Sequence, residues 1–509
     1  MTSTASKPAL GVVVSAFLAM AATYFTMAGG QFILTVAQVD LGFTIDEANA
    51  LTFAPAAASL VIVFLAGSLA DRWGSRPMLL GASALFTLGA LLVCVAPSLT
   101  WIIIGRLLDG IGGVTMTIVG LSVINTAFSE PTQRARIFAA YAAVTPAVFF
   151  LSPPLAALLV ESFGWRVAVI PWVIIGALTF VTSLRFVPRG HEGRTGELAT
   201  PLCAGLVLAG IALGAMNVNS HRGAAAIAFV IAAVALVLLV VLLRRFQEPT
   251  FNIKWVREPG VILLIVILFL TIMPNLFFYT SLLLQYRYTM SLTGIALLLM
   301  VPQAFAVAGG LLSAPVSERI GPARAVLVGL AATSISCLGQ LLVRGDSPIW
   351  VPVLTLSFFA LPFSFVVGPL TSVLLSRAPK EASGTASALR KATTNVASVF
   401  GGLILGTLAF DAFQSKLVDI LGGGGMAADV AQQLAKQIRD GAVVDQLADE
   451  LTDPFARDAL ISKGPGLLEA QSYAFAVCGL MSAGVFLLAT ALMALYVRRA
   501  PQAVEVEAA

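Results

Sequence analysis

Charged residues are scarce in this sequence. Only 11% of its 509 residues are Asp, Glu, Lys or Arg, whereas 58% are hydrophobic, and the mean hydropathy is +0.94. Soluble domains carry about 25% charged residues, so the composition excludes an ordinary soluble protein. Apolar runs of roughly 20 residues recur along nearly the whole chain, and a helix of that length crosses the hydrocarbon core of a bilayer. We therefore expect an all-α, polytopic membrane protein.

Cysteine and histidine are also rare, which argues against metal and disulfide chemistry. The four cysteines lie in apolar runs at unrelated spacings and are interpreted as small hydrophobic residues, and both histidines lie in polar connectors. No cluster of His, Cys, Asp and Glu has the spacing of metal ligands, and no G-x-x-x-x-G-K-[ST] segment is present to bind ATP phosphates. We expect no cofactor, no metal site and no enzymatic activity. If the protein moves a solute uphill, a gradient rather than ATP must drive the movement.

The apolar runs number fourteen, and the positive residues between them indicate the orientation. The runs fall at roughly 10–37, 48–69, 78–97, 100–126, 137–160, 166–187, 199–218, 224–243, 260–286, 292–316, 325–343, 350–376, 385–412 and 471–497. Lys and Arg are concentrated in alternate short connectors, and the intervening ones carry only scattered single arginines. The positive-inside rule therefore predicts that both termini lie in the cytoplasm. The first run has no small-residue cleavage site and is interpreted as a retained helix.

One connector, 413–470, is long and is predicted to lie outside the cytoplasm. It contains a flexible LGGGG break, after which Val430, Leu434 and Ile438 repeat at helical spacing. A second, acidic stretch at 444–453 repeats the pattern. We interpret the connector as a solvated helical hairpin. The alternative is a lid or a docking surface for a periplasmic or cell-wall partner.

The segment GSLADRWGSRPML, residues 67–79, joins the second and third runs. Its glycines permit close packing and a sharp turn, its aspartate can accept hydrogen bonds at a helix N-terminus, and its arginines can pair with carboxylates or lipid head groups. The segment resembles the cytoplasmic G-x-L-a-D-r-x-G-r-k motif of the major facilitator superfamily. We assign it as a cytoplasmic gate motif, whose residues are Gly67, Asp71, Arg72, Gly74 and Arg76. Asp71 is expected to lie near the start of span thirteen, around residues 383–385, when the protein is open outward.

The second half of the chain repeats this motif weakly. The segment PVSERIGPAR, residues 315–324, places Glu318 in the acidic position, followed by Arg319 and Arg324. Because the two copies follow spans two and ten, spans seven and eight are interpreted as an inserted pair between two repeated halves. Arg390, near the start of span thirteen, is expected to point toward the gate, and its neighbour Lys391 to extend to lipid head groups.

These features are similar to the fourteen-helix drug:proton antiporter branch of the superfamily. The segment 281–303 also resembles that branch, with Gln285, Gly294 and Pro302 matching its YLQ-x-V-x-G-x-S-x-x-x-A-G-x-x-x-L-P pattern. The resemblance implies a major facilitator fold in three parts. These are an N-terminal six-helix bundle (1–190), an inserted helix pair with cytoplasmic linkers (191–258), and a C-terminal six-helix bundle that includes the long connector (259–509).

Two segments depart from the branch pattern. Its first helix usually carries an aspartate within D-x-T-I-V-N-V-A, but here the stretch reads GQFILTVA, so that Gly30 stands in place of the acid. The fifth-helix motif G-P-x-x-G-G is replaced by SPPLAA. Ser152, Pro153 and Pro154 keep the small and helix-bending residues of that motif.

Span four carries two charges at bilayer depth, in the segment GRLLDGIGG. Arg106 and Asp109 are three residues apart, so they share one face of a helix and can meet. The segment resembles the fourth-helix motif R-x-x-q-G-x-g of the family, with Asp109 where glutamine is common. Ionisable residues inside a membrane are functional candidates. One interpretation is that Arg106 lines a central cavity and Asp109 carries a coupling proton; the alternative is a structural pair that orients the helix.

Further side chains on the spans are candidates for the substrate cavity. They are polar or aromatic, and for each polar one a hydrogen bond between helices is an equally good interpretation. The candidates are Gln31, Phe149, Asn275, Tyr279, Gln285, Gln303 and Asn395.

The resemblance implies a secondary active transporter of a bacterial inner (plasma) membrane. We expect export of lipophilic or amphiphilic, drug-like compounds by proton antiport with alternating access. One alternative is a lipid or lipophilic-metabolite transporter with weak or no proton coupling, which the missing first-helix acid favours. Another is a non-transporting membrane sensor of the same fold. The expected partners are the lipid bilayer, the substrate and protons, without nucleic acid, and the protein is expected to be a monomer.

Overall fold

The computed structural model describes eleven stretches of the chain. They are residues 7–42, 45–128, 130–189, 198–217, 222–245, 254–274, 276–287, 290–379, 382–422, 427–439 and 464–499. Within these stretches every regular element is helical. The expectation of an all-α protein is confirmed for this part of the chain.

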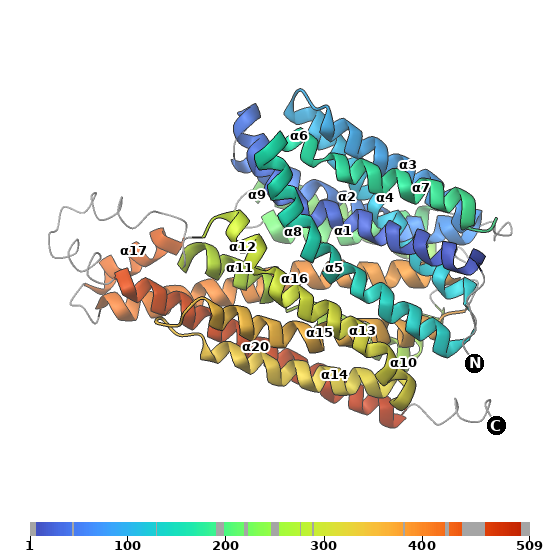
Figure 1. Ribbon diagram of the computed structural model, residues 1–509. Helices are drawn as coiled ribbons and strands as arrows, with labels where there is room; N and C mark the ends of the chain where they lie inside the picture. Colours follow the sequence, from blue (N-terminus) through green and yellow to red (C-terminus); the bar gives the residue numbers. More distant parts are fainter. Residues whose placement is uncertain are drawn as a thin grey trace.

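Seven helices form the first half of the bundle, coloured blue to teal in Figure 1. They are α1 (Lys7–Leu41), α2 (Ile45–Trp73), α3 (Ser75–Cys94), α4 (Leu99–Ala127), α5 (Pro131–Phe163), α6 (Trp165–Ala168) and α7 (Ile170–Phe186). Helix α4 lies at the centre, where it packs against α1, α2 and α3, while α3 and α7 pack together on the outside. Pro171 lies in the first turn of α7, a position where its missing N–H has no helical partner in any case.

The second half begins with the 3-10 helix η1 (Lys254–Arg257) and contains the helices coloured yellow-green to red in Figure 1. They are α10 (Pro259–Ile272), α11 (Leu276–Arg287), α12 (Leu292–Leu298), α13 (Met300–Ile320), α14 (Pro322–Cys337) with the 3-10 helix η2 (Leu338–Leu342), α15 (Trp350–Ser376), α16 (Ser383–Gly422), α17 (Ala428–Arg439) and α20 (Gly464–Arg499). The first predicted span of this half, 260–286, is not one continuous helix. It is interrupted after Ile272, beside Pro274, which cannot donate a backbone hydrogen bond.

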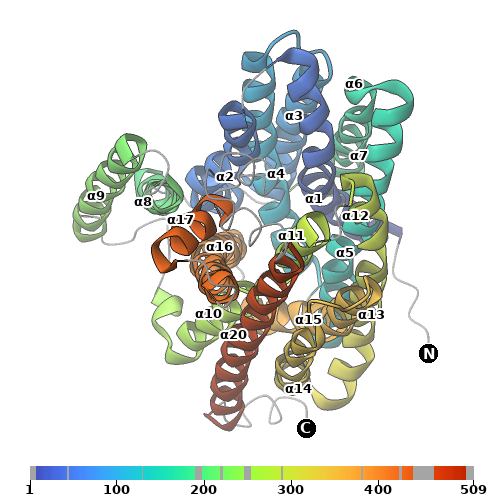
Figure 2. The same cartoon turned by 90° about the vertical axis from the view of Figure 1, so that its left-hand side faces the viewer.

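A separate pair of helices lies beside the bundle, as Figure 2 shows. Helices α8 (Ala199–Asn217) and α9 (Arg222–Arg245) pack on each other, and α8 packs on α2. The buried residues of α9 are alanines at helical spacing, Ala225, Ala228, Ala232 and Ala235, whereas its large aliphatic residues are exposed. An exposed apolar surface of this extent is typical of a membrane or partner interface, and on a helix hydrophobic all round it indicates contact with lipid.

Eleven helical segments of the described chain are long and apolar enough to cross a bilayer. Two further apolar helical segments, Ala199–Ala215 and Pro259–Ile272, are shorter. The first turn of α1 and the last turn of α20 lie at one end of the bundle, on the right in Figure 1, and α17 lies at the opposite end. We call the first of these the motif end, because the turn between α2 and α3 also lies there.

The long connector begins later in the chain than predicted. Helix α16 continues to Gly422, so residues 413–422 are helical, where a connector was expected. The amphipathic helix predicted from Val430, Leu434 and Ile438 is confirmed as α17, which packs on α16 and buries Leu434. The acidic stretch at 444–453 lies outside the described residues.

Candidate functional site

Arg106 and Asp109 form a buried ion pair inside the first half of the bundle. Nη1 of Arg106 lies 2.5 Å from Oδ2 of Asp109, and the two side chains are 6% and 5% exposed. The other carboxylate oxygen, Oδ1, accepts a hydrogen bond from Oγ1 of Thr26 on α1 at 3.3 Å. The prediction that these two side chains meet on one face of α4 is therefore confirmed.

Glycines on α4 bring this pair into the interior. A Cβ atom on Gly105 would lie 2.6 Å from the backbone oxygen of Gly89, so α3 and α4 are in backbone contact at this level. Such close approach is typical of membrane helices with small residues at their interface. As a result, neighbouring helices cover α4 on nearly every side after Arg106. A charge at this depth needs a partner, because desolvation of an isolated ion is costly.

Gly30 on α1 lies beside the same guanidinium group. A Cβ atom at Gly30 would be 3.6 Å from Nη2 of Arg106, and the guanidinium lies over the ring of Trp172, 5.5 Å from its centroid. The position at which the resemblance expects an acid thus faces Arg106. In this chain the anion next to Arg106 comes from α4, through Asp109, rather than from α1.

Asp71 joins the two halves of the bundle at the motif end. Its Oδ1 accepts from the backbone N–H of Gly384 at 2.7 Å, and its Oδ2 accepts from the N–H and the Oγ1 of Thr385 at 2.9 and 2.8 Å. These donors lie in the first turn of α16, where backbone N–H groups have no helical partners. The expected contact between Asp71 and the start of span thirteen is confirmed.

Gly67 permits this contact, since a Cβ atom there would lie 2.6 Å from the backbone oxygen of Gly384. Two other motif residues, Gly74 and Arg76, act within the first half. Gly74 separates α2 from α3 with a positive φ of 86°, a conformation that suits glycine. The Nη2 of Arg76 donates to the backbone oxygen of Leu184 on α7, within the same half. Gly67 and Asp71 thus contact the second half, whereas Arg76 bonds within the first half.

Two further polar contacts between the halves escaped sequence reasoning. Glu318 on α13 pairs with Arg136 on α5 at 2.8 Å, and Nδ2 of Asn125 on α4 donates to Oγ of Ser383 at 3.0 Å. Glu318 therefore does not copy the helix-terminus role of Asp71, although it occupies the same position in the repeated motif. Arg319 and Arg324 are exposed. The sequence showed that the connector carrying Arg136 is positively charged, but it did not show which residue Arg136 would pair with.

Two cations of α16 turn toward the interface between the halves. Arg390 is buried, and its Nε donates to Oγ1 of Thr371 on α15 at 2.8 Å. The ammonium group of Lys391 lies over the ring of Tyr24 on α1, 5.3 Å from its centroid. The interpretation that Lys391 extends to lipid head groups is therefore wrong. No carboxylate among the described residues lies within ion-pair distance of either cation.

The remaining cavity candidates are dispersed. Phe149 packs its ring 6.4 Å from that of Tyr24, close to Lys391, and Asn395 is half-buried on α16. Tyr279 lies in the hydrophobic core of the second half, and Gln303 is buried on α13. Asn275 lies outside the described residues, as do the side chains of Gln31 and Gln285.

The predicted helix-bending segment connects α5 to α1. Oγ of Ser152 donates to the backbone oxygen of Phe25 at 2.9 Å. Pro153 and Pro154 follow directly, inside a single continuous helix, α5. The small residue Ser152 thus serves the packing of these two helices.

Comparison with known proteins identifies the family. The sequence profile described as Major Facilitator Superfamily matches residues 13–402. The chain belongs to the Major Facilitator Superfamily. The superfamily fold is also seen in the human organic anion transporter MFSD10 (TETRAN), whose crystal structure aligns with 96% of this chain and 100% of that one, at a TM-score of 0.59 and 15% identity.

Relatives in this superfamily are bacterial efflux and resistance proteins. The multidrug resistance protein Stp of Mycobacterium tuberculosis (strain CDC 1551 / Oshkosh) is 27% identical over 361 residues, and the match covers 68% of this chain but only 66% of Stp. The tetracenomycin C resistance and export protein of Streptomyces glaucescens is 25% identical, over 91% of this chain and 87% of its own length. The multidrug efflux pump LfrA of Mycolicibacterium smegmatis is 27% identical, over 74% and 79%.

These comparisons decide the class of protein. The chain is a multi-pass membrane transporter rather than an enzyme. The resemblance to the superfamily, which the sequence carried in residues 67–79, is confirmed.

Proposed function

We propose that this transporter exports lipophilic or amphiphilic compounds across a bacterial inner membrane by proton antiport. Fourteen crossings are supported by the eleven long apolar helices, the two shorter ones, and α16, whose 40 residues are long enough to span a bilayer. The alternation of Lys and Arg along the chain supports a cytoplasmic location of the motif end. Drug efflux is the activity named for relatives at 24% and 27% identity.

Alternating access in this proposal depends on the contacts at the motif end. Asp71 with Gly384 and Thr385, together with the Arg136–Glu318 ion pair, joins the two halves there. The described conformation is then the one closed to the cytoplasm. Substrate release or uptake on that side requires the two halves to separate and these bonds to break.

The observation that carries the proton-coupling part is the buried Arg106–Asp109 pair beside Gly30. Asp109 is buried on α4, and its second oxygen accepts a hydrogen bond from Thr26 of α1. A proton on Asp109 would remove the partner of Arg106 and leave a buried cation. Because such a cation is costly, protonation favours a rearrangement of α1 and α4 that gives Arg106 a new partner or water.

Proteoliposomes with and without a pH gradient test this proposal. Asp109→Asn should abolish substrate accumulation driven by the gradient but retain substrate binding and exchange, whereas Thr26→Val, the matched control, removes only the hydrogen bond from α1. If Asp109→Asn accumulates substrate at the wild-type rate, the pair is structural and the coupling acid lies elsewhere. If the wild type transports no substrate in either condition, the alternative of a non-transporting membrane sensor is favoured.

A second candidate function is transport of an anionic amphiphile, such as a lipid or lipophilic metabolite with a carboxylate or phosphate group. The observation that favours it is the pair of neighbouring cations Arg390 and Lys391, of which Lys391 lies over Tyr24. Neither has a carboxylate within ion-pair distance among the described residues. Lys391→Gln should then reduce transport of anionic amphiphiles more than that of cationic drugs. Equal effects on both substrate types would speak against this candidate.

A further inference from the structure

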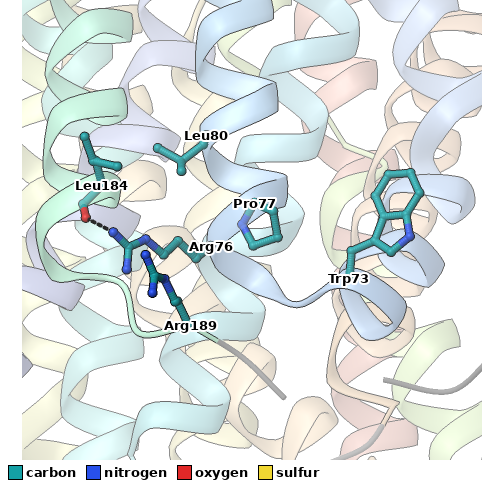
Figure 3. A pocket seen from close by; sticks show the side chains of 6 residues that line it. All are labelled: Trp73, Arg76, Pro77, Leu80, Leu184 and Arg189. Atoms are coloured by element: carbon teal, nitrogen blue, oxygen red, sulfur yellow. Dashed lines mark hydrogen bonds between the residues drawn. The ribbon is translucent and has the colours of Figure 1, made fainter. Parts of the chain in front are cut away.

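A pocket opens at the motif end, on the outer side of the first half. Its volume is about 370 Å³, and Figure 3 shows the side chains that surround it. They come from the end of α2, the first turns of α3, the end of α7 and the segment that follows α7. The lining residues are Trp73, Arg76, Pro77, Leu80, Leu184 and Arg189.

The pocket is positively charged. The side chains of Arg76 and Arg189 both line it, and Arg76 is fixed by its hydrogen bond to the backbone oxygen of Leu184 (Figure 3). No carboxylate in the described part of the chain lies within ion-pair distance of either arginine. Two like charges that line one pocket repel each other, so an anion bound in the pocket would be stabilised.

The rest of the lining is apolar and continues along the surface of α7. Trp73 is 55% exposed and Leu184 is 48% exposed. Beyond Leu184, the exposed residues of α7 at helical spacing are Val181, Leu178 and Ile174. Tryptophan is typical of the boundary between head groups and acyl chains. The pocket therefore lies where a bilayer presents both a phosphate group and the start of its acyl chains.

We propose that this pocket binds the phosphate of an anionic phospholipid from the surrounding membrane. The arginines would hold the phosphate oxygens, since guanidinium groups match phosphate geometry through paired N–H donors. The acyl chains would follow the exposed residues Leu184, Val181 and Leu178. The site is separate from the Arg106–Asp109 pair, so the inference does not depend on the substrate or on proton coupling.

Native mass spectrometry of the purified full-length protein in detergent tests the proposal. The probes are phosphatidylglycerol, phosphatidylcholine with the same acyl chains, and inorganic phosphate. The wild type should retain phosphatidylglycerol in preference to phosphatidylcholine, and inorganic phosphate should not displace it. Arg76→Gln and Arg189→Gln should each weaken phosphatidylglycerol binding by about fivefold, the effect of removing one basic residue near an anionic lipid surface. Arg324→Gln is the matched control, because Arg324 is an exposed motif arginine in the second half.

Several outcomes would overturn the proposal. Equal retention of the two lipids would mean that the pocket does not recognise an anionic head group. Displacement by inorganic phosphate would make it a site for a free anion, and an equal loss in Arg324→Gln would make the effect one of general charge. Because Arg76→Gln also removes the bond to Leu184, Arg189→Gln decides the matter if Arg76→Gln fails to fold.

Discussion

Asp71→Asn should weaken the closed motif end of the transporter. The carboxylate accepts three hydrogen bonds from the first turn of α16, two from Thr385 and one from Gly384. Asparagine keeps one oxygen, which can still face Thr385, but its NH2 group then faces the N–H of Gly384. One charge-assisted bond is lost and a donor is left facing a donor, because backbone N–H groups cannot accept.

The free energy that the closed state loses in Asp71→Asn can be worked out from these contacts. A hydrogen bond to a charged group contributes about 1.5–3 kcal/mol, and the stranded N–H of Gly384 adds to that loss, so we expect roughly 2–4 kcal/mol. At 1.36 kcal/mol for each factor of ten, the ratio of closed to open motif end falls roughly 30- to 900-fold. The protein should still reach the membrane, since the change does not touch the core of either half.

Two measurements on the same protein check this expectation. Spin labels at Trp73 and Pro379, which are both exposed, should report a longer distance in Asp71→Asn, in a background where Cys94 is replaced by serine. Transport by the variant in proteoliposomes should fall. Thr385→Val is the matched control, because it removes only the Oγ1 bond and should shift the distance less. Wild-type distances and wild-type transport in Asp71→Asn would refute the reasoning.

Three further predictions follow from other contacts. Gly30→Asp combined with Asp109→Asn should recover part of the thermal stability that Asp109→Asn loses in detergent, because a Cβ at Gly30 lies 3.6 Å from Nη2 of Arg106; no recovery would show that α1 cannot supply the anion. Hydrogen bonds from Trp165 and Arg166 hold the pKa of Asp40 below its ordinary value of 3.8. Their stabilising effect is therefore present above that value and lost as the pH falls through the lower pKa of the folded state, so the melting temperatures of wild type and Asp40→Asn should converge only in strong acid. Replacement of 423–463 by a short Gly/Ser linker should leave a monodisperse protein by size exclusion, and aggregation would show that this connector belongs to the core.

The candidate site could be predicted from sequence only where it depends on local geometry or on a motif. Arg106 and Asp109 meet because residues three apart share a face of any α-helix. Asp71 reaches α16 as the resemblance and the chemistry of a helix N-terminus predicted. The interruption after Ile272 was missed because both flanking segments are apolar, so that they read as one continuous span.

The sequence by itself determined that this chain is a helical membrane protein of the Major Facilitator Superfamily. The length of each apolar run and the motif in residues 67–79 depend only on residues that are neighbours in the chain. Only the tertiary structure decided which distant partners the charges find. Lys391 lies over Tyr24, Arg76 bonds to the backbone of Leu184, and Arg136 pairs with Glu318. These partners are separated by about a hundred residues or more in the chain, so no helical period relates them. The close packing of helix on helix, through residues such as Gly67, brings such groups within reach of each other.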